Sequence, residues 1–397
     1  MDFVAPTTLG TESLLAAELG ALGAADVEIL RGAVRFTGPL SAGYRAALWS
    51  RVASRVLLVL ARFQATDAAS LYEGVRALRW TDHLGPERSI AVDCVGKADW
   101  LKNSHFAELK VKDAIVDAIR DATGSRPNAN PRDPDLRLHV HLRDGLATLS
   151  LDLAGEALHR RGIGRETGDA PLKENLAAAI LLLAGWPEAA AEGRPLVDLM
   201  CGSGTLLLEA AWMARDVAPG LHRDRWGFTG WRGHQEAVWR GLLSEAAERR
   251  NAARGAPLRL VGYDTAVPTI HTATQNAGRA GVSDAIRLER RALPAATPPD
   301  GPAGLVVSNP PYGHRLGSDE HLEPMYAELG DVLRRRFLGW TAWIFTGSRA
   351  LANKVGLRSS RRIPLWNGPI ECRLLCYRIA EAAPTVGGGP AWRSGGA

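Results

Sequence analysis

The spacing of apolar residues changes twice along the chain and divides it into three parts. In residues 1–62, short apolar runs alternate with helical periods. Strands are expected at 3–6, 27–30, 33–36 and 55–61, and helices at 12–22 and in the residues before 48. Thr11 stands where its side chain can cap the first helix. This order of elements predicts a small α+β domain.

Residues 63–155 carry a second set of periods. The apolar positions of residues 106–122 recur every three to four residues, which is typical of a helix with one buried face. A further helix is expected at 70–78, a strand at 90–95, a loop at 124–134, and a hairpin with strands at 136–142 and 147–153. Residues 156–171 are polar and rich in Arg and Gly, which predicts a linker.

From residue 172 to about 381, buried strand patterns alternate with amphipathic helices. Helices are expected at 172–185, 205–216 and 267–280, and strands at 195–199, 259–263, 286–289 and 304–308. Alternation of this kind predicts an α/β fold with a parallel, doubly wound sheet. The last residues, 382–397, are rich in Gly, and we expect a disordered tail there.

Composition narrows the class of protein without assigning a function. The 397 residues suffice for two or three domains, and the net charge of +5 permits an anionic partner but does not demonstrate one. None of the four cysteines forms a Cys-x-x-Cys pair and no secretory signal is evident, so we expect a reduced, cytoplasmic setting. No apolar run reaches the ~18 residues of a membrane span, and the histidines lack zinc-site spacing. We therefore expect no membrane and no metal.

The first chemical motif is Asp198-Leu-Met-Cys-Gly-Ser-Gly-Thr205, at the end of the first strand of the α/β part. In such sheets, ligands bind beyond the carboxyl ends of the strands. Gly202 and Gly204 let the backbone approach a ligand closely, and the amides of the helix that follows favour a carboxylate. The motif predicts a site for a ligand with an acidic group.

Asp264, after the second strand, refines the nature of this ligand. Its carboxylate can accept both hydroxyls of a ribose, or it can instead cap the next helix. A dinucleotide-binding loop would carry a third glycine, but Leu207 stands at that position. These features favour a mononucleoside with an amino-acid tail, which is the chemistry of S-adenosylmethionine.

The second motif is Ser308-Asn-Pro-Pro-Tyr312, at the end of the fourth strand. The two prolines fix the backbone and lack amide donors, which leaves the Asn309 side-chain carbonyl and the Pro310 backbone carbonyl as acceptors. Two such acceptors match the hydrogens of an exocyclic NH2 group and help to aim its lone pair at a sulfonium methyl. Tyr312 supplies a ring on which a flipped base can stack. The motif predicts methyl transfer to an amine; an ordinary Pro-Pro turn is the alternative.

Other segments carry weaker signals. Residues 219–231 interleave basic residues with aromatics and interrupt the α/β alternation, and we favour a contact with nucleic acid over a cover for a sheet edge. Residues 173–175 either order the methionine end of the cofactor or form a solvated helix turn. Glu209, in the helix after the Gly loop, is interpreted as a surface charge.

On these motifs the α/β part resembles class I methyltransferases, and residues 1–155 resemble a ferredoxin-like domain followed by a THUMP domain, an RNA-binding module. The chain is most similar to the guanine-N2 half of the bifunctional 23S rRNA methyltransferase K/L family. The stretches that carry this resemblance are 48–55, 111–118, 171–180, 198–211, 218–222, 225–228, 307–313 and 367–369.

The resemblance implies a ferredoxin-like domain at 1–62, a THUMP domain at 63–155, a linker at 156–171 and a methyltransferase domain at 172–381. The last of these would contain a Rossmann-like, seven-stranded, mostly parallel sheet whose antiparallel end is formed by residues 338–345 and 368–379.

The implied activity is methylation of a guanine N2 in domain V of 23S rRNA, with S-adenosylmethionine as cofactor. The expected catalytic residues are Asn309, Pro310, Pro311 and Tyr312, and the expected cofactor-binding residues are Asp198, Cys201, Gly202, Ser203, Gly204, Thr205 and Asp264. Two departures stand out. The chain stops before the family's second methyltransferase domain, and residues 290–293 lack the acidic residue that the family usually places near the adenine.

Four other functions remain open. A tRNA guanine-N2 methyltransferase would have the same domain order, so tRNA is the second choice of partner. Asn-Pro-Pro-Tyr also resembles DNA adenine-N6 and protein glutamine-N5 methyltransferases, but the RNA-binding resemblance argues against both. A non-catalytic RNA-binding or ribosome assembly factor would retain the fold, although the two intact motifs argue against it.

Overall fold

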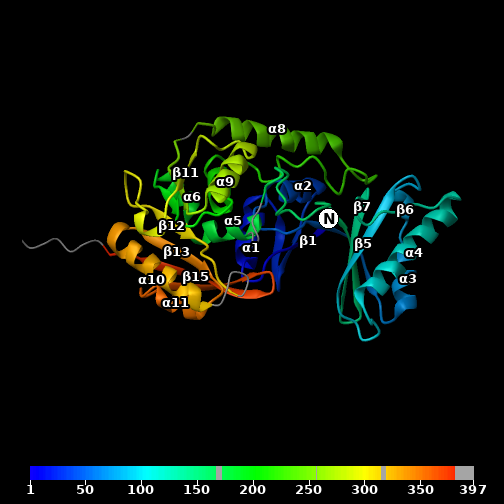
Figure 1. Ribbon diagram of the computed structural model, residues 1–397. Helices are drawn as coiled ribbons and strands as arrows, with labels where there is room; N and C mark the ends of the chain where they lie inside the picture. Colours follow the sequence, from blue (N-terminus) through cyan, green and yellow to red (C-terminus); the bar gives the residue numbers. More distant parts are fainter. Residues whose placement is uncertain (167–171, 256, 314–318, 381–397) are drawn as a thin grey trace, which may run out of the picture.

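The computed structural model describes residues 1–166, 172–255, 257–313 and 319–380. Within them the chain forms two β-sheets, an N-terminal sheet of eight strands and a C-terminal sheet of seven. Figure 1 shows the C-terminal sheet at the left and the N-terminal sheet from the centre to the right. The expected disordered tail at 382–397 and part of the expected linker, 167–171, lie outside the described residues.

The N-terminal sheet has the strand order β2-β3-β1-β4-β8-β7-β5-β6. Its strands are β1 (Asp2–Pro6), β2 (Ala25–Leu30), β3 (Ala33–Thr37), β4 (Leu57–Gln64), β5 (Ser89–Gly96), β6 (Asn128–Ala129), β7 (Leu136–Arg143) and β8 (Leu146–Asp152). Its helices are α1 (Glu12–Ala21), α2 (Leu40–Trp49), α3 (Ala68–Arg76) and α4 (Ser104–Thr123). The antiparallel pair β4–β8, from Leu57↔Asp152 to Gln64↔Leu146, joins the two N-terminal units into one continuous sheet.

Local sequence explains most of these elements. In β7, buried and more exposed residues alternate, as expected of a strand with one covered face. Asn103 begins α4 by accepting a hydrogen bond from the amide of Phe106 (2.8 Å), and Gly124 ends it with φ +76°. Thr11 precedes α1 as expected, but the prediction that its side chain caps the helix is wrong. Its hydroxyl donates to the carbonyl of Thr8 (2.6 Å) and accepts no hydrogen bond from a helix amide.

The C-terminal sheet has the order β11-β10-β9-β12-β13-β15-β14. Its strands are β9 (Leu196–Asp198), β10 (Leu260–Asp264), β11 (Ile286–Arg290), β12 (Leu305–Ser308), β13 (Thr341–Thr346), β14 (Arg361–Asn367) and β15 (Ile370–Arg378). The helices are α5 (Glu174–Leu183), α6 (Trp186–Ala191), α7 (Thr205–Ala214), α8 (Glu236–Ala252), α9 (Val267–Arg279), α10 (Asp319–Arg336) and α11 (Arg349–Lys354). The expected α/β fold is confirmed.

Strand direction in this sheet determines where a ligand can bind. The strands from β11 to β13 run parallel, and β15 is antiparallel to both β13 and β14. From β9 the chain proceeds outward through β10 to β11, and then returns to place β12 on the other side of β9. This reversal between β9 and β12 is a topological switch point, where open α/β sheets bind their ligands.

The segment that interrupts the α/β alternation forms an interface within the molecule. Trp226, Phe228 and Trp239 are buried around Tyr44 of α2, with ring centroids 4.5 Å apart for Tyr44–Phe228 and 5.0 Å for Trp226–Trp239. Helix α8 lies against α2, above the N-terminal sheet in Figure 1. The predicted contact of these aromatics with nucleic acid is therefore wrong, because their rings are buried in the hydrophobic core that they share with α2 and the N-terminal sheet.

A buried ion pair also links the two sheets. Arg161 and Glu209 have side chains that are each 2% exposed, and Arg161 Nε donates to Glu209 Oε1 at 2.9 Å. The same guanidinium donates to the carbonyls of Leu158 (3.1 Å) and Arg51 (2.9 Å). Glu209 is thus not a surface charge. It balances the charge of Arg161, which ties α7, the connector after β8 and the segment after α2 together.

We expect Glu209→Ala to lower the free energy of unfolding by about 3–5 kcal/mol, because it leaves the Arg161 guanidinium buried without a counter-charge. Chemical denaturation followed by circular dichroism measures this change. The matched control is Glu248→Ala, which removes an exposed carboxylate of α8 and should change stability by no more than about 0.5 kcal/mol. Equal effects of the two substitutions would contradict the role given to this pair.

Candidate active site

The two sequence motifs meet at the carboxyl edge of the C-terminal sheet. Strand β9 pairs with β10 on one side (Gly262↔Asp198) and with β12 on the other (Val306↔Val197). Because the three strands are parallel, the Gly loop after β9, Asp264 at the end of β10 and Asn309 after β12 share one edge of the sheet. The structure therefore brings the expected cofactor motif and the expected amine motif together.

Asp198 connects these motifs directly. It is 2% exposed, and its Oδ1 accepts hydrogen bonds from the Ser308 hydroxyl (2.5 Å) and the Met200 amide (3.2 Å). Ser308 Oγ in turn accepts from the amide of Leu199 (2.8 Å). Burial raises the pKa of Asp198 to about 7, and the charge of Asp264 adds to the rise, while the Ser308 hydrogen bond opposes it. Asp198 thus fixes the spacing between the two motifs from beneath the site.

The Gly loop has the backbone that a close-fitting ligand needs. Gly202 and Gly204 have φ values of +53° and +87°, and a Cβ added at Gly202 would meet nothing within 4 Å. Asp264 holds the loop, since its Oδ2 accepts from the amide of Gly202 (3.1 Å). Its Oδ1 accepts from the amide of Ala266 (3.1 Å), just before α9. One carboxylate therefore orders both the loop and the start of the next helix.

Cys201 lies within this loop but is not a reactive thiolate. Its side chain is buried, and burial raises its pKa well above the ordinary value, with further increases from Asp198 and Asp264. The neutral thiol packs among the apolar side chains beneath the loop, which include Leu207 of α7.

Two residues that the sequence did not single out order the same loop. Arg165 donates from Nη1 to the hydroxyls of Ser203 (3.0 Å) and Thr205, and from Nε to Glu174 Oε1 at 2.8 Å. Asn276, fully buried on α9, donates from Nδ2 to the carbonyl of Ser203 at 3.0 Å. A polar residue on the buried face of α9 was a signal that could have been noticed. No comparable signal in the sequence marks Arg165, because it lies in a polar segment that contains several other arginines.

In the second motif, the side-chain oxygen of Asn309 stands out. Asn309 Oδ1 is buried and has no hydrogen-bond partner among the described residues. An unpaired buried acceptor costs about 1–3 kcal/mol, so such an atom suggests a donor supplied by a ligand. The backbone that follows Asn309 is held in place by Tyr326. Its hydroxyl donates a hydrogen bond to the carbonyl of Pro311 (3.2 Å) and shares another with the hydroxyl of Thr346 (3.0 Å).

Tyr312 is held more firmly than a free stacking platform would be. Its hydroxyl accepts a hydrogen bond from Asn367 Nδ2 (3.1 Å), and its ring meets Phe345 edge-on, with centroids 6.2 Å apart. Burial raises the pKa of its hydroxyl well above the usual range. A Cβ at Gly347 would come within 2.8 Å of the ring, so this glycine makes room for it. Stacking of a base on Tyr312 stays a prediction.

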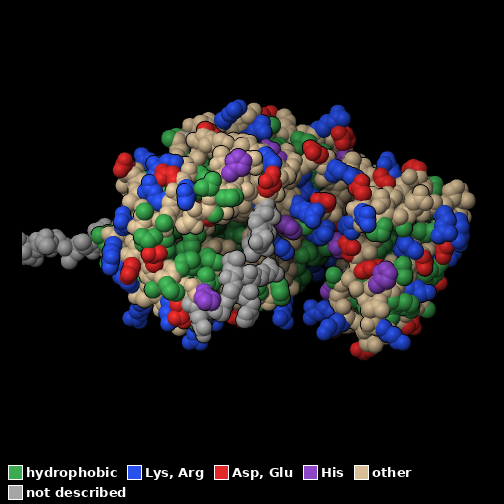
Figure 2. Space-filling model, in the orientation of Figure 1, with side chains coloured by type: hydrophobic (Ala, Val, Ile, Leu, Met, Phe, Trp, Pro, Cys, Tyr) green, Lys and Arg blue, Asp and Glu red, His purple; other side chains and the backbone are tan. Residues whose placement is uncertain are grey.

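A basic cavity of about 770 Å³ lies beside the motifs, between the connector after β8 and the turn between β14 and β15. Its cationic lining residues are Arg160, Arg161, Arg165 and Lys173, against two carboxylates, Glu156 and Glu174. His159 also lines it. Burial, together with the charges of Lys173, Arg160 and Arg161, lowers the pKa of its imidazole to about 4, so the ring is neutral near pH 7. Figure 2 shows the surface hollowed between the left and right parts of the molecule, with Lys and Arg side chains along the hollow.

Within the described part of the chain, no group of three or more His, Cys, Asp and Glu side chains is arranged to hold a metal ion. No helix there is both long enough and apolar enough to cross a membrane. All four cysteines are free and buried.

Comparison with known families decides the class of the chain. Residues 161–375, more than half of its length, match the model of the RMKL-like methyltransferase domain. The chain belongs to this methyltransferase family. Residues 2–57 match the RlmL ferredoxin-like domain and residues 65–152 the THUMP domain, which confirms the expected order of domains ahead of the methyltransferase domain.

Curated relatives of this methyltransferase carry the name Ribosomal RNA large subunit methyltransferase K/L. The protein from Pseudomonas paraeruginosa is 49% identical over 373 residues, which are 93% of this chain and 51% of the relative. The protein from Allochromatium vinosum is 49% identical over 376 residues, 94% of this chain and 51% of the relative. The chain spans about half the length of the curated relatives it matches.

Solved structures share the whole architecture. SMU.472, crystallised in complex with SAH, is 29% identical with a TM-score of 0.85, covering 96% of this chain and 99% of that one. A protein of Listeria monocytogenes described as a predicted N6-adenine-specific DNA methylase is 32% identical with a TM-score of 0.83, covering 95% and 96%. The methyltransferase fold expected from the sequence is confirmed.

The raised pKa of Asp198 has a consequence for stability. An unfolded aspartate loses its proton near pH 4, whereas folded Asp198 keeps it until about pH 7. Between these values the native state binds more protons than the unfolded state, so this group makes the protein less stable as pH rises, up to pH 7.

We expect Asp198→Asn, which cannot ionise, to gain stability relative to the wild type as pH rises from 5 to 7. The gain is at most about 1.4 kcal/mol per pH unit. Urea denaturation of both proteins at pH 5, 6, 7 and 8 measures it. Parallel pH profiles for the two proteins would contradict the assignment of this titration to Asp198.

Proposed function

We propose that this chain transfers the methyl group of S-adenosylmethionine to the exocyclic N2 amine of a guanine in 23S rRNA. The observation that carries the proposal is the buried, unpaired Oδ1 of Asn309 next to the Gly loop. A guanine amine that enters this site supplies the missing donor, and it does so beside the loop that suits the cofactor.

The residues at the edge of the sheet fit S-adenosylmethionine. The backbone of Gly202 to Gly204 has room for a closely packed ligand, and the first amides of α7 favour its carboxylate. Asp264 retains acceptor capacity on both oxygens for the ribose hydroxyls. Arg165 and Asn276 hold Ser203 in place for this role. Bound in this way, the sulfonium supplies an electrophilic methyl group, and the SAH complex of SMU.472 supports the choice of cofactor.

The Asn309 motif acts on the amine by orientation. Asn309 Oδ1 and the carbonyl of Pro310 accept the two N–H hydrogens, and Pro310 and Pro311 bring no amide donors that would compete. Holding both hydrogens turns the nitrogen lone pair toward the methyl group. The N–C bond forms as the S–C bond breaks, and the proton that the nitrogen then loses passes to solvent. No strong base is needed.

RNA is favoured as the molecule that carries the amine. The THUMP match, the basic cavity beside Tyr312 and the names of the 49% identical relatives all support it. The same names favour large-subunit ribosomal RNA over tRNA and over DNA. The choice of a guanine N2 comes from the sequence resemblance given above. The reduced, buried state of the cysteines fits action in the cytoplasm.

We expect Asn309→Ala to lower the turnover number for methyl transfer by about 100-fold or more, because one of the two acceptors that orient the amine is lost. Transfer of tritium from labelled S-adenosylmethionine to rRNA measures it, and calorimetry should show unchanged cofactor affinity. Asn353→Ala, at an exposed position of α11, is the matched control and should behave as the wild type. Full activity of Asn309→Ala would overturn the mechanism.

The choice of RNA is tested in cells. Mass-spectrometric mapping of N2-methylguanine in rRNA and tRNA from a strain that lacks this gene should show loss at one 23S site. Re-expression of the wild type should restore the mark, and the Asn309→Ala variant should not. Loss confined to tRNA would overturn the choice of rRNA in favour of a tRNA methyltransferase.

A further inference from the structure

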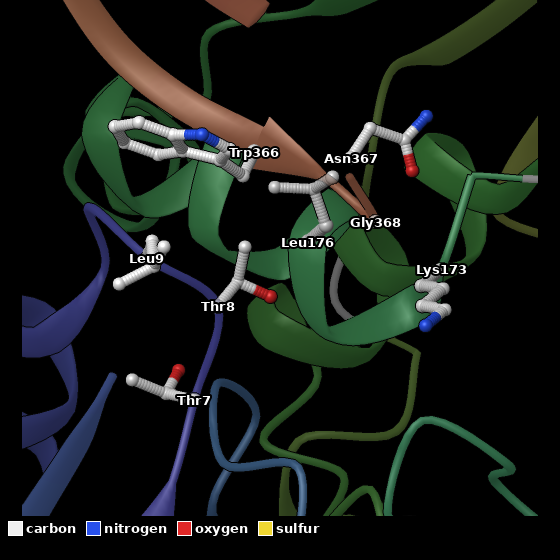
Figure 3. A pocket seen from close by; sticks show the side chains of 8 residues that line it. All are labelled: Thr7, Thr8, Leu9, Lys173, Leu176, Trp366, Asn367 and Gly368. Atoms are coloured by element: carbon white, nitrogen blue, oxygen red, sulfur yellow. The ribbon is translucent and has the colours of Figure 1, made fainter. Parts of the chain in front are cut away.

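A second, smaller cavity of about 240 Å³ lies between the two sheets. Three segments line it: the loop after β1, the start of α5 and the end of β14 with its turn (Figure 3). The lining residues are Thr7, Thr8, Leu9, Lys173, Leu176, Trp366, Asn367 and Gly368. None of them belongs to the cofactor motif or to the Asn309 motif.

The walls of this pocket combine an aromatic face with polar groups. Figure 3 shows Trp366 on one side, Leu9 and Thr8 on the other, and Lys173 at one end. Trp366 is half-buried, so part of its ring remains free to contact a ligand. The Thr8 hydroxyl has no hydrogen bond among the described residues, whereas the Thr7 hydroxyl donates a hydrogen bond to the carbonyl of Val52 (3.0 Å). A flat, partly polar group fits between such walls.

Lys173 adds a charge suited to a phosphate. Its side chain is exposed and forms no ion pair among the described residues, in contrast to Arg165 and Arg161 nearby, which are paired with carboxylates. An unpaired ammonium at one end of an aromatic pocket matches a nucleotide, whose base and phosphate are joined by a single sugar.

The pocket is connected to the candidate active site. Lys173, Asn367 and Gly368 line both this pocket and the larger basic cavity, so the two are neighbouring parts of one groove. Asn367 also donates the 3.1 Å hydrogen bond to the hydroxyl of Tyr312 in the amine motif. Asn367 thus lies between the pocket and Tyr312, beside which a flipped guanine would bind.

The walls are also held in place before any ligand arrives. Gly10 has φ +88°, and a Cβ at this position would come within 2.6 Å of the carbonyl of Pro364 in β14. The loop after β1 therefore lies tightly against the strand that carries Trp366, and only glycine permits this approach. A preformed pocket binds without the cost of ordering its walls.

We propose that this pocket binds a second, unstacked nucleotide of the substrate RNA, next to the target guanine in the strand. Its base packs against Trp366 and accepts a hydrogen bond from Thr8, and its phosphate contacts Lys173. The pocket holds the strand in register while the guanine reaches Asn309. This inference rests on the proposed RNA substrate, and it explains how a loop of the ferredoxin-like domain contributes to a site of the methyltransferase domain.

Steady-state kinetics with rRNA from the gene-deletion strain test the pocket. We expect Trp366→Ala to raise KM for rRNA about 5- to 100-fold, the effect of losing one stacked base, with kcat and cofactor affinity nearly unchanged. Trp366→Phe should retain most of the affinity, and Lys173→Ala should weaken binding more than Lys173→Arg. Leu338→Ala, an exposed apolar site at the opposite edge of the sheet, is the matched control.

Ultraviolet cross-linking locates the nucleotide directly. Irradiated complexes of the wild type with rRNA should yield a nucleotide attached to the tryptic peptide of residues 363–373, which contains Trp366. Excess AMP should not displace it, because a lone nucleotide lacks the neighbouring contacts of the strand. Displacement by AMP would assign the pocket to a free nucleotide and overturn the proposal.

The outcomes separate this inference from the function it rests on. If the wild type methylates rRNA while Trp366→Ala keeps the wild-type KM and the 363–373 peptide carries no cross-link, the pocket proposal fails and the function stands. If the wild type methylates no RNA, the proposed function fails, and the pocket proposal fails with it.

Discussion

The hydrogen bond between Ser308 and Asp198 is the constraint on which the site depends. It joins the ends of two adjacent parallel strands, one of which leads into the Gly loop and the other into the Asn309 motif. Because Asp198 is buried, the bond forms where water cannot compete for it. It therefore sets the distance between the Gly loop and the Asn309 motif, the segments that we propose hold the methyl donor and the amine. Direct transfer requires such a fixed distance.

The N-terminal half packs against the methyltransferase domain and is not merely joined to it by a linker. Its sheet is continuous from the ferredoxin-like unit to the THUMP unit, and aromatic residues of the methyltransferase domain fill the space above α2. The buried pair Arg161–Glu209 and the contacts of Arg165 with the Gly loop tie the connector to the catalytic half. These contacts give the N-terminal half a fixed position relative to the catalytic half, as the proposed RNA substrate requires if it contacts both.

The sequence predicts those features of the fold and site that depend on local hydrophobic patterns and on short motifs. The α/β alternation predicts β9, β10, β11 and β12 to within a residue or two, since each is a short apolar run that ends in a turn. Strand β14 was not predicted. The two motifs could be placed at one edge because parallel strands end together. The pairing of β4 with β8 could not be predicted, because it joins residues about 90 positions apart and neither strand specifies its partner.

The errors have a common origin. The sequence predicts a nucleic-acid contact for Trp226 and Phe228 and a surface charge for Glu209, because it shows the type of a side chain but not what covers it. In each case a partner distant in sequence, Tyr44 or Arg161, buries the group. Arg165 was overlooked for the same reason, since its role appears only when the Gly loop is beside it.

The central claim is that Asn309 and Pro310 present an exocyclic guanine amine to the methyl group. The most direct measurement is product identification after incubation of rRNA from the gene-deletion strain with S-adenosylmethionine bearing a deuterated methyl group. Digestion to nucleosides and mass spectrometry should find the label in N2-methylguanosine. Label in N6-methyladenosine or 7-methylguanosine would contradict the account, because the site would then act on a different nitrogen.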